Sequence, residues 1–263
     1  MINVSKLKCV NSTTSKGNQR KWTDGEIYIK EDSLGYEGVA ECIVSEFLDC
    51  VQLPSWLSFV NYYECEIFDG INKSVGCYSK NFLDAGEEIV PLYRVLKLST
   101  DNIQKLLKGT VGRGLYEESC RLADIIECKY FDKYLSILLT LDALVLNEDR
   151  HLNNICFIKK GSSFRVAPIF DNGLSLLSDV DDYPLTVGLS GNIRKVNFKP
   201  FSVKWERQLS YVEVSRLRVD FNKLMYRLNN GYLSYYPIGY FNRAIGVLKT
   251  RLRKYEGILW EKI

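Results

Sequence analysis

The sequence predicts an α+β fold with two lobes: a small strand-rich lobe over residues 1–80 and a larger, mainly helical lobe over residues 81–263. Three observations lead to this prediction. Short segments with strand-like alternation dominate the first 80 residues and flank one amphipathic helix. A densely apolar helical segment follows at residues 122–146. Helical periodicity then returns at residues 210–228 and 240–260.

Four stretches of the small lobe are predicted to be strands: residues 2–10, 25–30, 59–68 and 74–78. Each combines β-branched or aromatic residues with alternation, the pattern of a half-buried strand. Residues 11–21 between the first two are polar and contain a single glycine. A strand–loop–strand unit of this kind can fold over nucleotide phosphates, although a plain hairpin turn is the commoner explanation.

Residues 39–51 are expected to form the helix of this lobe, because their apolar residues recur at three-and-four spacing. Glu41 lies in its first turn, and Lys30 ends the preceding strand. Kinases use a strand lysine paired with a helix glutamate to hold nucleotide phosphates. Glu37 and Glu46 are competing partners for Lys30, and two unrelated surface charges are the simpler alternative.

The strongest functional signal follows the long apolar helix. Asp149 comes just after it, Asn154 follows five residues later, and Asp171 comes after two strand-like runs at residues 155–158 and 164–169. The runs flank a short turn with a glycine, which predicts a β-hairpin. Antiparallel pairing should bring Asn154 and Asp171 together at the open end of this hairpin.

These residue types suit phosphoryl transfer. An aspartate placed like Asp149 can orient an attacking hydroxyl, and Asn154 and Asp171 offer the hard oxygen ligands that magnesium prefers. Each residue alone is also a common turn former, so their joint spacing decides the interpretation. Asp142, unusual in an apolar helix, is expected to brace the loop or to lie on the helix surface. The sequence therefore predicts a two-lobed protein-kinase-like fold.

Composition argues against several other classes. A net charge of +3 over 263 residues, without a dense basic block, gives no support for direct nucleic-acid binding. No stretch approaches the length of a membrane segment, and the polar start is unlike a signal peptide. The eight cysteines form no Cys-x-x-Cys pair and the chain has one histidine, so zinc binding and cysteine–histidine catalysis are not expected. We expect a reduced, cytoplasmic protein.

Two further segments are assigned by their place in a kinase-like chain. Residues 79–82 are expected to form the hinge between the lobes and to present backbone groups to adenine. Residues 178–201 are polar and loop-like, and they lie where an activation or substrate loop follows the metal-binding aspartate.

The motifs resemble those of the HipA-like serine/threonine kinases, most of all the compact CtkA-type members, over residues 11–171. The family's Asp-x-His-x-x-Asn segment is similar to Asp149-Arg-His-Leu-Asn-Asn154, and its metal motif is similar to Ala167-Pro-Ile-Phe-Asp171. Its Ser-Gly-x-Gln-x-Lys phosphate loop resembles Lys16-Gly-Asn-Gln-Arg-Lys21, with Lys16 in place of the serine. The family's ATP-lysine strand is similar to residues 25–30, its glutamate helix to residues 40–45 and its hinge to residues 77–82. Asp142 matches a family aspartate that lies seven residues before the catalytic one.

This resemblance implies a kinase that uses ATP and magnesium to phosphorylate Ser or Thr of a protein substrate, and often itself. It assigns Asp149 as the hydroxyl-orienting base and Asn154 and Asp171 as magnesium ligands. His151 is assigned to fixing the loop by hydrogen bonding and not to the metal. The implied nucleotide contacts are Lys30, positioned by Glu41, with Gly17, Asn18, Gln19 and Lys21 of the phosphate loop and Ser79, Asn81 and Phe82 of the hinge.

The resemblance also bears on partners and regulation. Family members include toxins held by an antitoxin and secreted effectors, so an antitoxin or regulatory protein is an implied partner, and delivery as an effector is an alternative to a cytoplasmic location. Because Lys16 replaces the loop serine, regulatory autophosphorylation is expected within residues 12–15 instead.

Two other functions stay open. Lys195, Lys199 and Lys204 leave room for a lipid headgroup or a small alcohol as the phosphoryl acceptor. A nucleotide-binding pseudokinase is the weakest alternative, because the four residues that such a protein loses are all present: Lys30, Asp149, Asn154 and Asp171.

Overall fold

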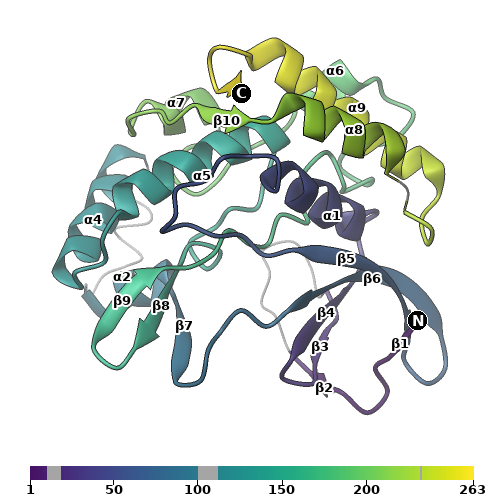
Figure 1. The fold of residues 1–263 in the computed structure, drawn as a ribbon, viewed down its shortest axis with the longest axis horizontal. Coiled ribbons are helices and arrows are strands. Elements are labelled where there is room, and N and C mark those ends of the chain that lie inside the picture. The colour runs from purple at the N-terminus through teal and green to yellow at the C-terminus, as the bar shows by residue number, and fades with distance from the viewer. Residues whose placement is uncertain (11–18, 100–111, 232) are drawn as a thin grey trace.

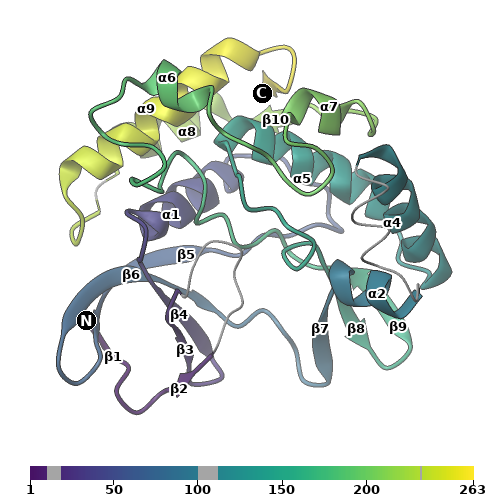
Figure 2. The ribbon, with the colours of Figure 1, turned by 180° about the vertical axis from the view of Figure 1, so that it is seen from behind.

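The computed structural model describes residues 1–10, 19–99, 112–231 and 233–263. It is a mixed α+β structure, as the sequence predicts. Figure 1 shows a strongly curved sheet from the N-terminal part of the chain, helices packed on one side of it, and a second small sheet beside it. Figure 2, the view from behind, shows long irregular segments between the helices and the sheet. The predicted lobe boundary at residue 80 stays a prediction.

The N-terminal sheet is built from β1 (Ile2–Asn3), β2 (Lys8–Cys9), β3 (Lys21–Thr23), β4 (Ile27–Glu31), β5 (Tyr62–Phe68) and β6 (Lys73–Lys80). Their order across the sheet is β1-β5-β6-β4-β3-β2. Neighbouring strands run antiparallel, apart from the parallel pair β1 and β5. Strand β4, which contains Lys30, therefore lies inside the sheet between β3 and β6, where pairing on both sides fixes its backbone.

The prediction of one strand over residues 2–10 is wrong. The chain turns between β1 and β2, where the Leu7 N–H donates to the Val4 carbonyl at 3.0 Å. The Asn3 side-chain oxygen accepts from the Ser5 N–H at 3.0 Å, an Asx-type contact that competes with strand pairing. The two halves of the predicted strand consequently lie at opposite edges of the sheet.

Helix α1 (Glu37–Leu48) confirms the predicted helix of the small lobe with shifted ends. It packs against β5 and β6 on one side and against α8 (Phe221–Asn230) and α9 (Ile238–Tyr255) on the other. Almost every residue of α1 is buried, because it lies between two layers. Its apolar side chains share one hydrophobic cluster with those of α5 (Phe131–Val145) and α9. This shared core fixes Glu41 of α1 relative to the residues that follow α5.

The predicted β-hairpin is present as β8 (Cys156–Lys160) and β9 (Ser163–Val166). Gly161 at its turn has φ +60°, a conformation that glycine adopts without strain. A third strand, β7 (Glu87–Pro91), pairs with β8 and leads directly into α2 (Leu92–Ser99). The sequence interpretation did not include β7.

The long helix predicted over residues 122–146 is in fact the end of α4 (Arg113–Ile125) and the whole of α5. The chain breaks between them at Glu127 and Tyr130, which have φ values of 55° and 66°. Left-handed residues cannot continue a right-handed helix, so apolar density alone misjudged the boundary. Helix α5 is buried along most of its length and ends at Leu146, also left-handed at φ 58°, which turns the chain toward Asp149.

The C-terminal part is less helical than predicted. Residues 210–228 are not one helix: α7 (Trp205–Leu209) precedes this stretch, β10 (Leu217–Val219) interrupts it, and α8 follows. β10 pairs with β11 (Trp260–Lys262) in a small parallel sheet. The predicted loop over residues 178–201 contains only the short helix α6 (Leu189–Ile193).

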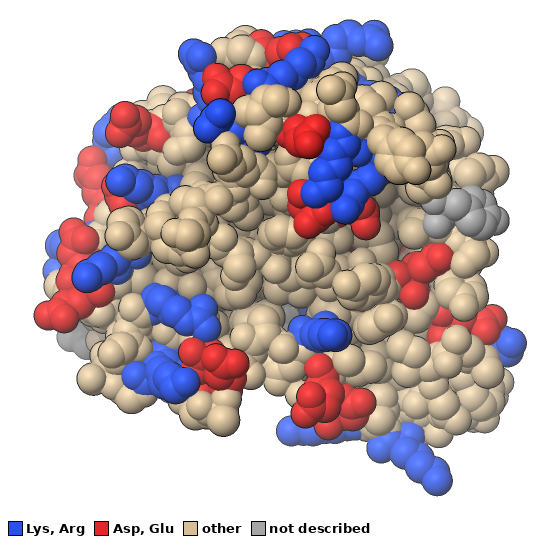
Figure 3. Space-filling model, viewed as in Figure 1, with Lys and Arg blue, Asp and Glu red and all other residues tan. Residues whose placement is uncertain are grey.

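Helix length, surface charge and the state of the cysteines bear on the protein classes that the composition argues against. Among the residues that the structure describes, no helix is long and apolar enough to cross a membrane. On the face shown in Figure 3, basic and acidic side chains are interspersed. All eight cysteines are free thiols, most of them buried, where a thiol packs as a small apolar group.

Candidate functional site

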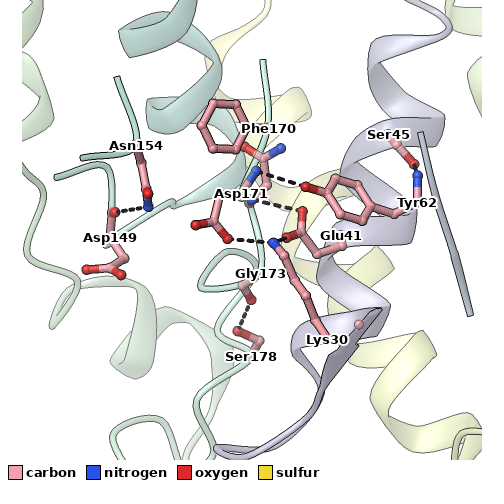
Figure 4. A network of polar contacts seen from close by, with 12 residues as sticks. Lys30, Glu41, Ser45, Tyr62, Asp149, Asn154, Phe170, Asp171, Gly173 and Ser178 are labelled. Carbon is pink, nitrogen blue, oxygen red and sulfur yellow. Dashed lines mark hydrogen bonds and ion pairs between the residues drawn. The ribbon is translucent and has the colours of Figure 1, made fainter. Parts of the chain in front are cut away.

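Lys30 lies at the centre of the candidate site. Its Nζ lies 2.6 Å from Oε1 of Glu41 and 2.6 Å from Oδ1 of Asp171 (Figure 4). The predicted pairing of Lys30 with Glu41 is therefore present, and Glu37 and Glu46 are not its partners. Strand β4 and helix α1, which are neighbours in the sequence, meet the chain after β9 here, and Lys30 and Asp171 are 141 residues apart.

The opposite charges of this cluster stabilise the ionised forms of Lys30 and Asp171. Burial alone would favour the neutral form of Lys30, but the carboxylates of Asp171 and Glu41 outweigh it and raise the pKa of the amine well above its usual value. Burial also opposes ionisation of Asp171, yet Lys30 and Lys21 hold the pKa of this carboxyl well below its usual range. Asp171 is therefore an anion at neutral pH, the form that a magnesium ligand requires.

The backbone at Asp171 is held in an unusual conformation. Its φ is 58°, in the left-handed region that an aspartate tolerates better than most residues. Its N–H donates to the Tyr62 hydroxyl at 3.3 Å, and the next N–H, of Asn172, donates to Oε2 of Glu41 at 2.8 Å. The Gly173 carbonyl accepts from the Ser178 hydroxyl at 2.6 Å. These contacts fix the direction of the Asp171 side chain (Figure 4).

Asp149 and Asn154 belong to a compact loop between α5 and β8. The Asn154 side-chain nitrogen donates to the Asp149 carbonyl at 3.1 Å, and the Asn154 N–H donates to the His151 carbonyl at 2.8 Å. The Asp149 N–H donates to Oδ1 of Asn147 at 3.0 Å. Because its nitrogen makes the contact within the loop, the Asn154 amide group presents its oxygen in a different direction.

A buried ion pair joins this loop to the Asp171 turn. Arg150, completely buried, lies 3.0 Å from Oδ2 of Asp142. The same guanidinium donates to the Phe170 carbonyl and to the Asn172 side chain, both at 2.6 Å. Asp142 thus braces the loop, one of the two roles expected for it, and Arg150 transmits that support to the residues on either side of Asp171.

His151 and Lys199 flank the Asp149 carboxylate. Lys199 Nζ lies 2.8 Å from Oδ1 of Asp149, and His151 Nε2 lies 3.7 Å from Oδ2. The His151 Nδ1 accepts from the Asn153 N–H at 3.2 Å, which agrees with the predicted loop-fixing role. Burial lowers the pKa of His151, with Asp149 opposing the shift. Lys199 comes from the predicted substrate loop, 50 residues after Asp149 in the sequence.

The predicted site residues converge on one pocket. Asp149, Asn154 and Asp171 line it together with Gln19, the described end of the predicted phosphate loop. The lining is completed by Ser33, Leu34, Glu37, Gly173 and Leu174. An ionised carboxylate and an amide group in the wall of one pocket are a donor set that suits magnesium.

The other residues predicted to contact the nucleotide lie in several different parts of the structure. Gly17 and Asn18 lie outside the described residues. Lys21 is in β3 opposite Lys30, and burial lowers the pKa of its amine. Ser79 lies within β6, flanked by β4 and β5, so the predicted hinge begins inside the sheet. Asn81 donates through its N–H to the Glu26 carbonyl at 2.7 Å and Phe82 packs on Phe170, with ring centroids 5.7 Å apart.

Sequence reasoning missed several residues that build the site. Arg150 had a usable signal, because a buried aspartate such as Asp142 requires a counter-charge nearby. Tyr62 and Asn172 had none, since their contacts depend on the packing of β5 and α1 against the Asp171 turn. Lys199 had no local signal either, because only the folding of residues 194–204 over the loop brings it to Asp149.

Comparison with known structures bears on the fold. The chain is similar to the crystal structure of the Helicobacter pylori proinflammatory kinase CtkA, with a TM-score of 0.59 and 16% sequence identity. The match covers 96% of this chain and 94% of that one. No protein-family model matches the sequence, and no curated protein matches it. The likeness supports a kinase-like fold, whereas the two-lobed layout and membership of the HipA-like family stay predictions.

Proposed function

We propose that this protein is a serine/threonine protein kinase of HipA-like type, which transfers a phosphoryl group from ATP with the help of magnesium. The observation that supports this most directly is the double ion pair of Lys30 with Glu41 and Asp171, at 2.6 Å each, beside the Asp149–Asn154 loop. Active kinases require this lysine–glutamate pair and a metal-binding aspartate in place together.

Each residue has a defined task in this proposal. Lys30 donates to the nucleotide phosphates, while Glu41 keeps its amine at the right place. The Asp149 carboxylate orients the acceptor hydroxyl and accepts its proton, a contribution of typically 10²–10⁴-fold in rate. Arg150 keeps the two halves of the site in register through the Phe170 carbonyl and Asn172. Such positioning is the main catalytic device available for phosphoryl transfer.

Asp171 and Asn154 are the residues that would hold magnesium. Both line the pocket, Asp171 is ionised, and the amide nitrogen of Asn154 is engaged within the loop, which leaves its oxygen for the metal. When bound, magnesium neutralises charge on the phosphates and orients them. A protein Ser or Thr is proposed as the acceptor because the sequence motifs resemble those of the HipA-like serine/threonine kinases.

The test is incubation of the purified chain with MgATP, followed by intact-mass and peptide mass spectrometry. Phosphate on Ser or Thr of the wild type, absent from an Asp149→Asn variant, is the expected result. The variant preserves the volume of the side chain, and its melting temperature shows whether the fold is intact. Peptide mapping also tests the predicted autophosphorylation within residues 12–15.

Other outcomes redirect or refute the proposal. Magnesium-dependent nucleotide binding without autophosphorylation leads to a panel of Ser/Thr peptides, phosphoinositides and small alcohols as acceptors. Phosphorylation of a lipid or alcohol alone would contradict the protein-kinase assignment. A wild-type chain that binds no nucleotide at all would refute the catalytic interpretation.

A further inference from the structure

Glu37 has an unusual environment in the first turn of α1. Its side chain is buried, with 3% of the residue exposed, yet it lines the same pocket as Asp149, Asn154 and Asp171. One oxygen, Oε1, accepts from the N–H groups of Ser33 and Leu34 at 2.9 and 2.8 Å. That oxygen closes the turn between β4 and α1, which is a sufficient structural role for half of the carboxylate.

The other oxygen has no such role. Oε2 of Glu37 is buried and has no hydrogen-bond partner among the residues that the structure describes. A buried carboxylate oxygen without a donor is rare in folded proteins, because it loses its hydration without compensation. Glu37 belongs to the wall of the pocket, so a small ligand that displaces the atoms covering Oε2 from the pocket side would supply the missing partner.

The charges around the pocket indicate the kind of ligand. Asp149 and Asp171 each have a lysine within 2.8 Å, whereas no ion pair joins Glu37 to a basic side chain in the described part of the chain. Asp32 is a second acid near Glu37, and burial and the negative charge of Glu37 raise its pKa. Whether protonated or ionised, it carries no positive charge that could offset Glu37. A phosphate placed in this pocket beside a bare carboxylate would be repelled, unless a cation lies between them.

We propose that Oε2 of Glu37 binds a cation that enters the pocket with the reactants. This inference rests on the proposed kinase function and extends it to a residue outside the predicted catalytic set. Two sources have the required chemistry: a second divalent ion bound with the nucleotide, or the basic side chain of a Lys or Arg next to the acceptor Ser or Thr. In either case Glu37 is a positioning and specificity residue.

Glu37→Gln is the decisive variant. An amide oxygen can still accept from Ser33 and Leu34, so the turn is retained, but the negative charge is lost. Glu117→Gln is the matched control, because Glu117 is an exposed residue of α4 whose nearest basic atom, on Arg113, lies 3.9 Å away. The melting temperature of both variants without ligand should stay close to that of the wild type.

Two measurements separate the sources of the cation. In the first, MnCl2 is titrated into protein with and without ATP, and bound Mn²⁺ is counted by electron paramagnetic resonance. In the second, KM and kcat are compared for a pair of Ser peptides that differ only in Arg or Ala beside the acceptor. Loss of one charge-assisted contact should either lower the affinity for Mn²⁺ or raise KM for the Arg peptide, by about tenfold or more.

The outcomes are distinct. Weaker Mn²⁺ binding in Glu37→Gln, with unchanged peptide preference, assigns the site to a divalent ion. A higher KM for the Arg peptide alone, with kcat retained, assigns it to the acceptor. If the wild type is active and Glu37→Gln matches it in both measurements, the cation inference is overturned while the kinase assignment stands. If the wild type binds no nucleotide and phosphorylates nothing, both fail together.

Discussion

Replacement of Arg150 by alanine is the most severe test of the network that joins the two halves of the site. The guanidinium is completely buried and contacts Asp142, the Phe170 carbonyl and Asn172. Alanine removes all of these donors at once. It also leaves the Asp142 carboxylate, which is only 1% exposed, without its counter-charge in the interior.

The magnitude follows from that burial. Removal of one partner of a buried ion pair costs about 3–5 kcal/mol, because the remaining charge is desolvated and unpaired. Domains are stable by only about 5–15 kcal/mol, so Arg150→Ala should remove a large part of the total. At roughly 2–4 °C per kcal/mol for a chain of this size class, the melting temperature should fall by roughly 6–20 °C.

The assay is urea unfolding at pH 7, with Arg121→Ala as the control. Arg121 makes a bidentate pair with Glu118 at 2.7 Å, shorter than the 3.0 Å between Arg150 and Asp142, but on the surface of α4. Its loss should therefore cost less than about 1 kcal/mol. The double variant Asp142→Leu/Arg150→Met should be more stable than Arg150→Ala, since it buries no charge. A cost for Arg150→Ala no larger than that of Arg121→Ala would refute the reasoning.

Three further predictions concern the site and the sheet behind it. Lys30→Met should abolish the magnesium-dependent thermal shift with ATP, because no other described lysine forms ion pairs with both Glu41 and Asp171. A retained shift would contradict the assignment of Lys30. Since burial lowers the pKa of His151, the unfolded chain binds a proton more readily, so this residue should make stability fall as pH drops through about 6.5 toward 5. Its imidazole NMR signal, from the chain's single histidine, should titrate below about 6.5, and Lys199→Ala should raise that midpoint by removing a neighbouring positive charge. Gly76→Ala should destabilise the protein by about 1–3 kcal/mol, since the new Cβ would lie 2.0 Å from the Lys30 carbonyl. Gly239→Ala, where the new Cβ meets open space, is the control and should be nearly neutral in the same thermal melt.

Local patterns in the sequence were sufficient for much of the site. The spacing of Asp149, Asn154 and Asp171 around a hairpin depends on strand geometry and turn chemistry, both of which are properties of neighbouring residues. The structure has that hairpin, and the three side chains line one pocket. The pairing of Lys30 with Glu41 was predictable for the same reason, because the strand and the helix are adjacent in the chain.

Local patterns failed where the chain's long-range packing decides the outcome. Residues 2–10 and 122–146 look continuous by hydrophobicity, but the strand is divided between two sheet edges and the helix is broken at left-handed residues. Hydrophobic periodicity reports which face is buried, and it does not report where the backbone must turn to reach the next layer.

The sequence by itself determined the α+β class and the hairpin, and it included Glu41 among the possible partners of Lys30. Only the tertiary structure decided that Asp171 shares Lys30 with Glu41 and that Arg150 links the loop to the Asp171 turn. It also decided that Glu37 lines the pocket and that its Oε2 is unpaired among the described residues. The physical reason is that these contacts join segments more than a hundred residues apart or depend on burial. The free energy of a charge depends on its surroundings, and those surroundings exist only once β4, α1 and the chain after β9 have packed together.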